Sequence, residues 1–188
     1  MQKIIFLNGA SSTGKTSIAN KIQETSTHNF MLIGIDTVIS MMPNHLNNWT
    51  GGKVDQGFWW KTEIDQHGHN CSHIMLGDFA KKVSGSLLSM TQALLNDGHN
   101  VIIDEVCLDQ EAAKNWQKIL SEFNVFYIEI TTDLTTLERR EKARGDRMIG
   151  SARAQAKLIH QIGFKYDLII DSSDKPVDEC VRIIMDKY

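Results

Sequence analysis

The sequence predicts an α/β fold, a three-layer sandwich in which a five-stranded parallel sheet carries helices on both faces. Short apolar runs alternate with longer segments of helical period, the pattern of repeated strand–helix units. The first apolar run is continuous, as expected for a strand buried on both faces. The chain has 188 residues, two prolines and no low-complexity linker, which together predict one domain over residues 1–188.

The N-terminal half contains two predicted strands, the helix between them and a long helix further on. The first three elements are expected at residues 3–8, 15–26 and 30–35, and the second strand ends at Asp36. Residues 37–70 are rich in Asn, Gly, His and Trp, and we expect them to be irregular and to leave the sheet. From Ser72 to Asp97 apolar residues recur every three or four positions, which predicts one amphipathic helix capped by Gly98.

The C-terminal half continues the alternation with three strands and four helices. The strands are predicted at residues 101–103, 124–131 and 166–170. Asp109 and Asp133 have the residue type and position of N-terminal caps, and they open helices that end near residues 123 and 145. A third helix is predicted at residues 151–161, and Pro176 opens the last one.

Composition narrows the functional classes. The net charge is -3 without a basic block, which argues against nucleic acid as a partner. No apolar run approaches the roughly 18 residues of a membrane span, so no membrane partner is expected. The three cysteines are widely spaced and odd in number, which indicates a reducing, cytoplasmic location without a disulfide framework. The sequence leaves the oligomeric state open and is compatible with an oligomer.

A glycine-rich segment between the first strand and the first helix fits G-x-x-x-x-G-K-[ST] at Gly9, Ala10, Ser11, Ser12, Thr13, Gly14, Lys15 and Thr16. Glycines let backbone N–H groups converge on an anion, and the following helix adds its positive N-terminal end. We therefore expect a P-loop NTPase fold that binds a purine nucleoside triphosphate. Lys15 is expected on the β- and γ-phosphates, and the Thr16 hydroxyl on Mg²⁺.

Two aspartates are expected at the carboxyl edge of the sheet, where open α/β sheets bind ligands. Asp36 ends the second strand and is a candidate catalytic base for an attacking hydroxyl. The alternative is that Asp36 caps a short helix over residues 37–42. Asp104 ends the third strand, where a carboxylate could hold Mg²⁺ through water or orient the acceptor. Glu105 alternates to the other face of the strand and is expected to be structural.

Four arginines crowd one predicted helix and the turn after it: Arg139, Arg140, Arg144 and Arg147. Such density usually marks a solvated helix face, here with glutamates as partners. Gly145 ends the helix, however, and places Arg144 and Arg147 in a loop. Arginines on a mobile loop can neutralise a transferring phosphoryl group and exclude water. We therefore expect residues 139–150 to form a lid in which Arg144 and Arg147 are catalytic.

These motifs resemble the chloramphenicol phosphotransferase family over nearly the whole chain. The family's N-G-x-S-S-x-G-K-[ST] stands at residues 8–16, its G-x-D at residues 34–36, and its III-D-[DE]-V stretch at residues 101–106. Residues 140–147 match R-E-x-A-R-G-D-R, a run far more specific than the glycine loop, and Gln155 follows in the next helix.

The resemblance implies an adenylate-kinase-like fold that transfers the γ-phosphate of ATP to a hydroxyl, with Mg²⁺ as the second cofactor. It implies that Asp36 deprotonates the primary hydroxyl of the antibiotic and that Arg144 and Arg147 bind phosphate. Residues 172–175 would lie near adenine, and we also assign Arg140 to the nucleotide. The expected partner is a small-molecule hydroxyl acceptor, with chloramphenicol the named candidate.

Residues 44–73 depart from the family pattern and are expected to form a substrate-side excursion from the sheet. With part of the following helix, they should line the acceptor pocket. Trp59 and Trp60 are the predicted substrate-binding residues, beside Trp49 and Phe58, because a flat substrate would stack on aromatic surface. The alternative for each tryptophan is that it anchors a hairpin on the core.

Residues 67–73 place His67, His69, Cys71 and His73 at alternating positions. On a strand these side chains would share one face and could hold a metal ion. Gly68 favours a turn instead, and ordinary surface or substrate-lining histidines are the alternative reading.

Three other functions stay open from the sequence. They are a kinase for another metabolite such as a sugar or nucleoside, a toxin-like kinase, and a P-loop regulatory protein that binds nucleotide without an acceptor. A GTP switch is disfavoured because the sequence has no Asn-Lys-x-Asp stretch to bind guanine.

Overall fold

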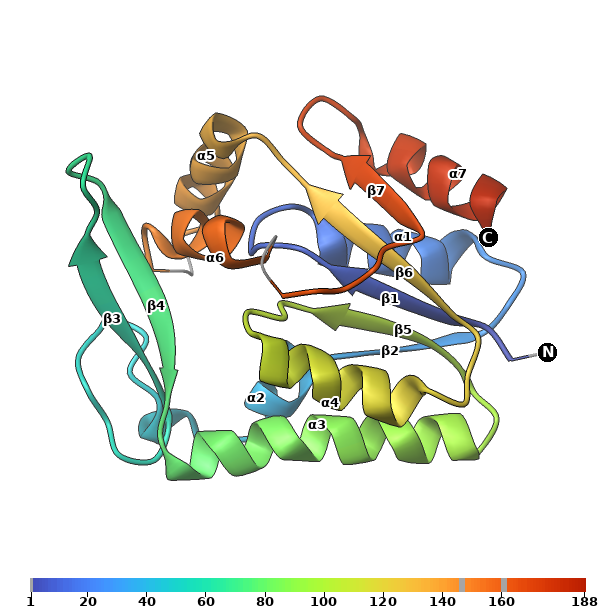
Figure 1. Ribbon diagram of the computed structural model, residues 1–188, viewed down its shortest axis with the longest axis horizontal. Helices are drawn as coiled ribbons and strands as arrows, with labels where there is room; N and C mark the ends of the chain where they lie inside the picture. The colour runs from blue at the N-terminus through green and yellow to red at the C-terminus, as the bar shows by residue number, and fades with distance from the viewer. Residues whose placement is uncertain (1, 146–147, 160–161) are drawn as a thin grey trace.

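A computed structural model describes residues 2–145, 148–159 and 162–188 (Figure 1). Its centre is a parallel sheet whose strands lie in the order β2-β5-β1-β6-β7. The strands are β1 (Ile4–Asn8), β2 (Phe30–Gly34), β5 (Asn100–Glu105), β6 (Val125–Thr131) and β7 (Leu168–Asp171). The predicted α/β sandwich with five parallel strands is therefore confirmed.

Helices cover both faces of this sheet. α1 (Lys15–Thr25) and α7 (Val177–Lys187) lie on one face, and α3 (Asp78–Asn96) and α4 (Gln110–Leu120) lie on the other (Figure 1). Alternate residues of β1 enter separate cores, with Ile5 and Leu7 on the α1 side and Ile4 and Phe6 on the α3 side. Each such fully buried side chain contributes about 1.5–3 kcal/mol. Burial on both faces explains why the first apolar run does not alternate with polar residues.

The loops that follow the adjacent strands β1 and β5 lead to opposite faces of the sheet. The loop after β1 leads to α1, whereas the loop after β5 leads to α4 on the other face. Such a switch opens a crevice at the carboxyl ends of the strands. The fold itself therefore places the glycine-rich loop and the end of β5 at the mouth of one crevice.

A second layer of elements stands beyond these carboxyl ends. It comprises α2 (Ile35–Ser40), a 3₁₀ turn (Asn44–Leu46), a hairpin of β3 (Phe58–Ile64) and β4 (Asn70–Leu76), α5 (Leu134–Arg144) and α6 (Ser151–Ile159). The hairpin packs against α6 through β4, and α6 also packs against α5 (Figure 1). These elements form the walls of the crevice.

The hairpin corrects two predictions. Residues 37–70 are irregular only in part, because β3 and β4 pair in antiparallel register from Phe58 opposite Leu76 to Ile64 opposite Asn70. The long helix also begins at Asp78 and not at Ser72, since residues 72–76 belong to β4. The chain is extended at Gly77, and the Gly77 N–H donates to the Gly57 carbonyl at 2.9 Å. This hydrogen bond marks the end of the hairpin. The apolar spacing of residues 72–76 suits either element, so periodicity alone misplaced the boundary.

The predicted caps are present. Asp109 and Asp133 accept hydrogen bonds from the N–H groups of Ala112 and Thr136 at 2.7 and 2.9 Å. Gly98 follows the C-cap residue Asp97 of α3 and has φ 81°, the left-handed conformation that ends many helices. In the part of the chain that the structure describes, no helix is long and apolar enough to cross a membrane.

Candidate active site

The glycine-rich loop between β1 and α1 forms a curled anion-binding backbone. Gly14 has φ 95° and Ser12 has φ 68°, so two left-handed residues turn the N–H groups inward. Gly9 has φ 159°, and a Cβ atom there would collide with the backbone carbonyl of Ile130. The loop therefore requires glycine at its first position for space as well as for conformation.

Ser12 provides an independent indication that this loop holds a polar ligand. Its Oγ is buried, and it is the one such side-chain atom among the described residues that has no hydrogen-bond partner. A buried hydroxyl without a partner costs about 1–3 kcal/mol. A phosphate oxygen at the loop would supply the missing partner, so the residues present fit a nucleotide.

Lys15 lies beneath the loop with only 5% of its surface exposed. Its Nζ donates to the Ala10 carbonyl at 3.0 Å. Burial lowers the pKa of Lys15, while the nearby carboxylates of Asp104, Glu105 and Asp36 act in the opposite direction and favour the charged form. A cation held between acidic groups at the base of a loop is placed to neutralise phosphate.

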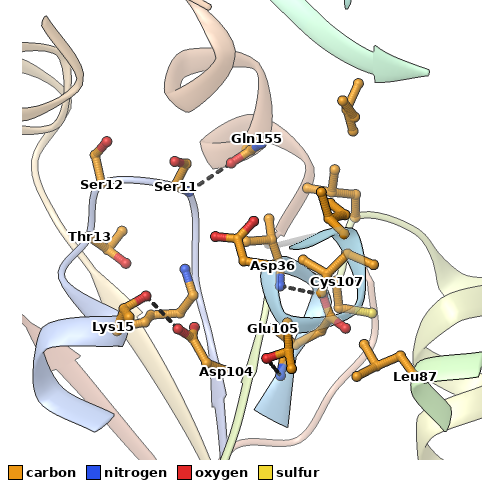
Figure 2. A pocket seen from close by; sticks show the side chains of 18 of the residues that line it. Ser11, Ser12, Thr13, Lys15, Asp36, Leu87, Asp104, Glu105, Cys107 and Gln155 are labelled. Atoms are coloured by element: carbon orange, nitrogen blue, oxygen red, sulfur yellow. Dashed lines mark hydrogen bonds between the residues drawn. The ribbon is translucent and has the colours of Figure 1, made fainter. Parts of the chain in front are cut away.

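Thr16 and Asp104 meet across the crevice. The Thr16 hydroxyl donates to Asp104 Oδ2 at 2.5 Å, and Figure 2 shows Asp104 beside Lys15. Sheet register produces this approach, because Leu7 of β1 lies opposite Asp104 of β5. A hydroxyl and a carboxylate are hard oxygen ligands, the type that Mg²⁺ prefers. These two predicted metal ligands therefore lie together, and this pair of side chains would hold Mg²⁺.

Asp36 stands on the other side of Asp104, in the first turn of α2. The structure does not use it as the helix cap, because the cap position is occupied by Gly34. Gly34 pairs with Asp104, and a Cβ atom at Gly34 would meet the Asp104 carbonyl. This close approach of β2 to β5 holds Asp36 near the metal-side carboxylate. Asp36 is exposed and lines the same cavity as the loop (Figure 2).

The arginines divide into two groups. Arg144 is exposed at the end of α5 and lines the cavity, close enough to Lys15 for its charge to disfavour the charged form of that lysine. Arg140 also lines the cavity, and its Nη2 donates to the Ser172 carbonyl at 2.8 Å. Arg140 thereby supports the segment expected near adenine. Arg147, predicted to be catalytic, lies outside the described residues, so the lid of residues 139–150 is described only in part.

One cavity of about 950 Å³ joins the loop to the elements beyond it. Its donor end is formed by the loop, Arg140, Ser172, Lys175 and Val177. Its acceptor end lies past Asp36 and is mainly apolar, with contributions from α3, α4, the hairpin and the segment ahead of it that include Trp49, Phe58, Trp60, Leu76, Leu87 and Trp116. The volume suits a small molecule beside a nucleotide.

The two predicted substrate-binding tryptophans have different positions. Trp60 is 6% exposed and lines the acceptor end, whereas its neighbour Trp59 is not among the lining residues because adjacent strand residues point to opposite faces. Trp49 and Phe58 both line the cavity and stack on each other, with centroids 6.1 Å apart and an interplanar angle of 14°. The aromatic residues thus anchor the hairpin and form the pocket wall at the same time.

The hydrogen bonds of two residues at the site were not predicted from the sequence. Gln155 of α6 accepts a hydrogen bond from the Ser11 N–H at 2.7 Å, which joins residues 144 positions apart (Figure 2). Glu141 is 1% exposed and accepts hydrogen bonds from Gly150, Ser151 and Ala152 at the start of α6. A glutamate ten residues ahead of a serine at a predicted helix start is too weak a signal to reveal this contact.

The histidine cluster surrounds the tip of the hairpin. Gly68, with φ 82°, makes the turn that the sequence suggested, and His67 and His69 are exposed there. Cys71 lies on β4 and is buried. Within the described part of the chain, no group of three or more His, Cys, Asp and Glu side chains is arranged to hold a metal ion.

The architecture is shared with solved kinase structures. A sugar kinase from Janibacter sp. HTCC2649 superposes with a TM-score of 0.66 at 13% identity, covering 99% of this chain and 94% of the other. The APS kinase CysC of Mycobacterium tuberculosis, solved with AMPPNP and APS, gives 0.62 at 17% identity, with 99% and 96% coverage. At these identities the likeness shows the fold alone. Together with the glycine-rich loop, it defines the P-loop NTPase α/β fold.

The family is shown by the sequence match. Residues 2–188 match the family described as chloramphenicol phosphotransferase-like protein, and the chain belongs to that family. It is also 28% identical over 186 residues to a Mycobacterium tuberculosis protein named "Putative O-phosphotransferase Rv2636", covering 99% of this chain and 82% of the other.

Proposed function

We propose that this kinase transfers the γ-phosphate of ATP to a hydroxyl of a small molecule, with Asp36 as the base. The observation that supports this most directly is that donor and acceptor sides share one cavity. The glycine-rich loop, Thr16, Asp104 and Asp36 all line it, and it continues into an apolar extension. A regulatory nucleotide-binding protein would not need that extension or a carboxylate at its entrance.

The residues divide the chemistry between them. Lys15 and Arg144 offset the negative charge of the phosphates, and Thr16 and Asp104 would hold Mg²⁺, which supplies further charge neutralisation and alignment. The Asp36 carboxylate accepts the proton of the acceptor hydroxyl while the oxygen of that hydroxyl bonds to the γ-phosphorus. The bond from that phosphorus to the β–γ bridging oxygen breaks, and ADP leaves with the bonding electrons.

The acceptor end favours a substrate with a neutral apolar body and one reactive hydroxyl. Its surface is formed largely by Trp60, Leu76, Leu87 and neighbouring apolar residues. Chloramphenicol, which has an aromatic ring and a primary hydroxyl, remains our named candidate on the basis of the family. A sugar or nucleoside kinase is the alternative, and hydrophobic walls discriminate between such acceptors by only about 1–3 kcal/mol per methylene.

The test is phosphorylation of a panel of hydroxyl compounds, chloramphenicol among them, followed by mass spectrometry. ATP consumption should require one class of acceptor and yield a product heavier by one phosphate. Lys15→Ala should abolish both. Slow ATP hydrolysis that no acceptor accelerates would contradict the proposal and favour the regulatory alternative.

A further inference from the structure

Gln155 is a buried amide that already engages the phosphate loop. It is 7% exposed, lines the cavity and accepts the Ser11 N–H at 2.7 Å through its Oε1 (Figure 2). Backbone N–H groups of such a loop are the donors that a phosphate uses. One N–H cannot donate a short, linear hydrogen bond to two acceptors at once. A phosphate oxygen at Ser11 must therefore displace Gln155.

The position of Ser11 indicates which phosphate would compete. The N–H groups at the start of α1 belong to the other end of the loop, three or more residues further along the chain. Next to Ser11 lies the Ala10 carbonyl, and Lys15 Nζ is 3.0 Å from that oxygen. The lysine of this motif reaches the β- and γ-phosphates. Ser11 consequently lies at the terminal-phosphate end of the loop.

We propose that Gln155 is a specificity-determining residue that competes with the terminal phosphate of the nucleotide for the Ser11 N–H. The inference rests on the proposed donor site. With a triphosphate bound, the γ-phosphate takes the N–H and Gln155 withdraws. Once the phosphoryl group has been transferred, the diphosphate no longer reaches Ser11 and Gln155 binds it again. The competition weakens triphosphate binding selectively and returns the loop to one arrangement after each turnover.

The helix that carries Gln155 is also attached to the acceptor side. Lys157, two residues further along α6, donates to Asp65 Oδ2 at the hairpin turn at 3.0 Å. Ser72 of β4 donates through its hydroxyl to the Ile149 carbonyl just ahead of α6 at 2.9 Å. Withdrawal of Gln155 therefore acts on the element that packs against the hairpin wall of the acceptor pocket.

The experiment measures binding of ADP and of AMPPNP, a non-hydrolysable triphosphate, by calorimetry. Gln155→Met removes the competing oxygen at similar volume, so the Kd for AMPPNP should fall about threefold to tenfold, the worth of one hydrogen bond. The Kd for ADP should stay within about twofold. Gln117→Met, an exposed residue on α4, is the matched control and should change neither value.

Gln155→Glu tests the same contact in the opposite direction. Its carboxylate should bind the Ser11 N–H more strongly and repel phosphate, so the Kd for AMPPNP should rise at least about tenfold at pH 7.5. This loss should shrink as the pH falls towards the ordinary pKa of a glutamate, because protonation removes the charge. If Gln155→Met does not fold, Gln155→Asn is the second variant. It withdraws the amide by one methylene and should also lower the Kd for AMPPNP.

Equal changes for ADP and AMPPNP in Gln155→Met would show a packing role and overturn the inference. Weaker AMPPNP binding in that variant would also overturn it, since Gln155 would then support the triphosphate. If the wild-type protein binds neither nucleotide, the proposed donor site itself fails, a result distinct from an unchanged ratio of the two affinities.

Discussion

The Thr16 hydroxyl donates to the Asp104 carboxylate at 2.5 Å, joining the first turn of α1 to the end of β5. The two side chains come from different elements that line one crevice, and their alignment depends on the pairing of β1 with β5. We expect both to hold Mg²⁺. Asp104→Asn should therefore raise the Mg²⁺ concentration for half-maximal activity by at least about tenfold.

Two substitutions at Thr16 separate the metal role of this pair from packing. Thr16→Ser keeps the hydroxyl and should retain the half-maximal Mg²⁺ concentration of the wild type. Thr16→Val keeps the shape but removes the hydroxyl, so its half-maximal Mg²⁺ concentration should rise. The measurement is initial rate against Mg²⁺ concentration at saturating ATP. An unchanged half-maximal concentration in Asp104→Asn would remove Asp104 from the metal site.

Asp36 should affect the chemical step and leave nucleotide binding intact. Asp36→Asn keeps the size of the side chain but removes the proton acceptor, so kcat should fall about 10²- to 10⁴-fold on the true acceptor. The KM for ATP should change less than about twofold, because the loop and Lys15 are untouched. Asp186→Asn, an exposed carboxylate near the C-terminus, makes the same chemical change and should be silent. Near-normal turnover in Asp36→Asn would mean that another group accepts the proton.

The central sheet and the donor loop could be predicted because their signals are local. Strand β1 consists of four consecutive apolar residues followed by Asn8. It leads directly into the glycine motif, whose residues all belong to one short segment of the chain. The hairpin could not be placed in the same way. The pairing of Phe58 with Leu76 depends on residues 18 positions apart, and the segment from Ser72 to Leu76 also fits a helical period.

The acceptor side and the contacts of α6 could not be predicted from the sequence for a related reason. Gln155 meets Ser11 across 144 residues, and nothing in the local pattern of either segment indicates the other. Trp59 and Trp60 looked equivalent as neighbours in the chain. Only the direction of β3 relative to the cavity shows that Trp60 lines it.

Glu141 should stabilise the fold by holding the N-terminus of α6. Its carboxylate accepts hydrogen bonds from Gly150 N and Ala152 N, each at 2.8 Å, and from Ser151 Oγ at 2.6 Å. Glu141→Ala leaves these buried donors without an acceptor, and we expect the free energy of unfolding to fall by about 3 kcal/mol. Denaturant titration measures this directly.

Glu138 provides the matched control for that change. It lies one turn earlier on α5, with 39% of its side chain exposed, and pairs with Arg153 Nε at 2.6 Å. A partly exposed ion pair contributes about 0–1 kcal/mol, so Glu138→Ala should cost much less than Glu141→Ala. Similar losses in the two variants would show that α6 does not depend on the buried carboxylate.

Gly34 and Gly85 offer a paired test of how the strands position Asp36. A methyl group at Gly34 would collide with the Asp104 carbonyl, whereas one at Gly85 of α3 would meet no atom within 4 Å. Gly34→Ala should therefore separate β2 from β5, lower the free energy of unfolding by about 1–3 kcal/mol and reduce kcat by moving Asp36. Gly85→Ala should raise stability by up to about 1 kcal/mol, because alanine favours a helix.

The kinetic effects should differ between these glycines as well. Gly85 lines the acceptor end, so its alanine variant should change KM for the acceptor and leave kcat nearly unaltered. Gly34→Ala should lower kcat while the KM for ATP stays close to that of the wild type. A Gly34→Ala enzyme with full kcat would show that close contact between β2 and β5 is not what holds Asp36 in its catalytic position.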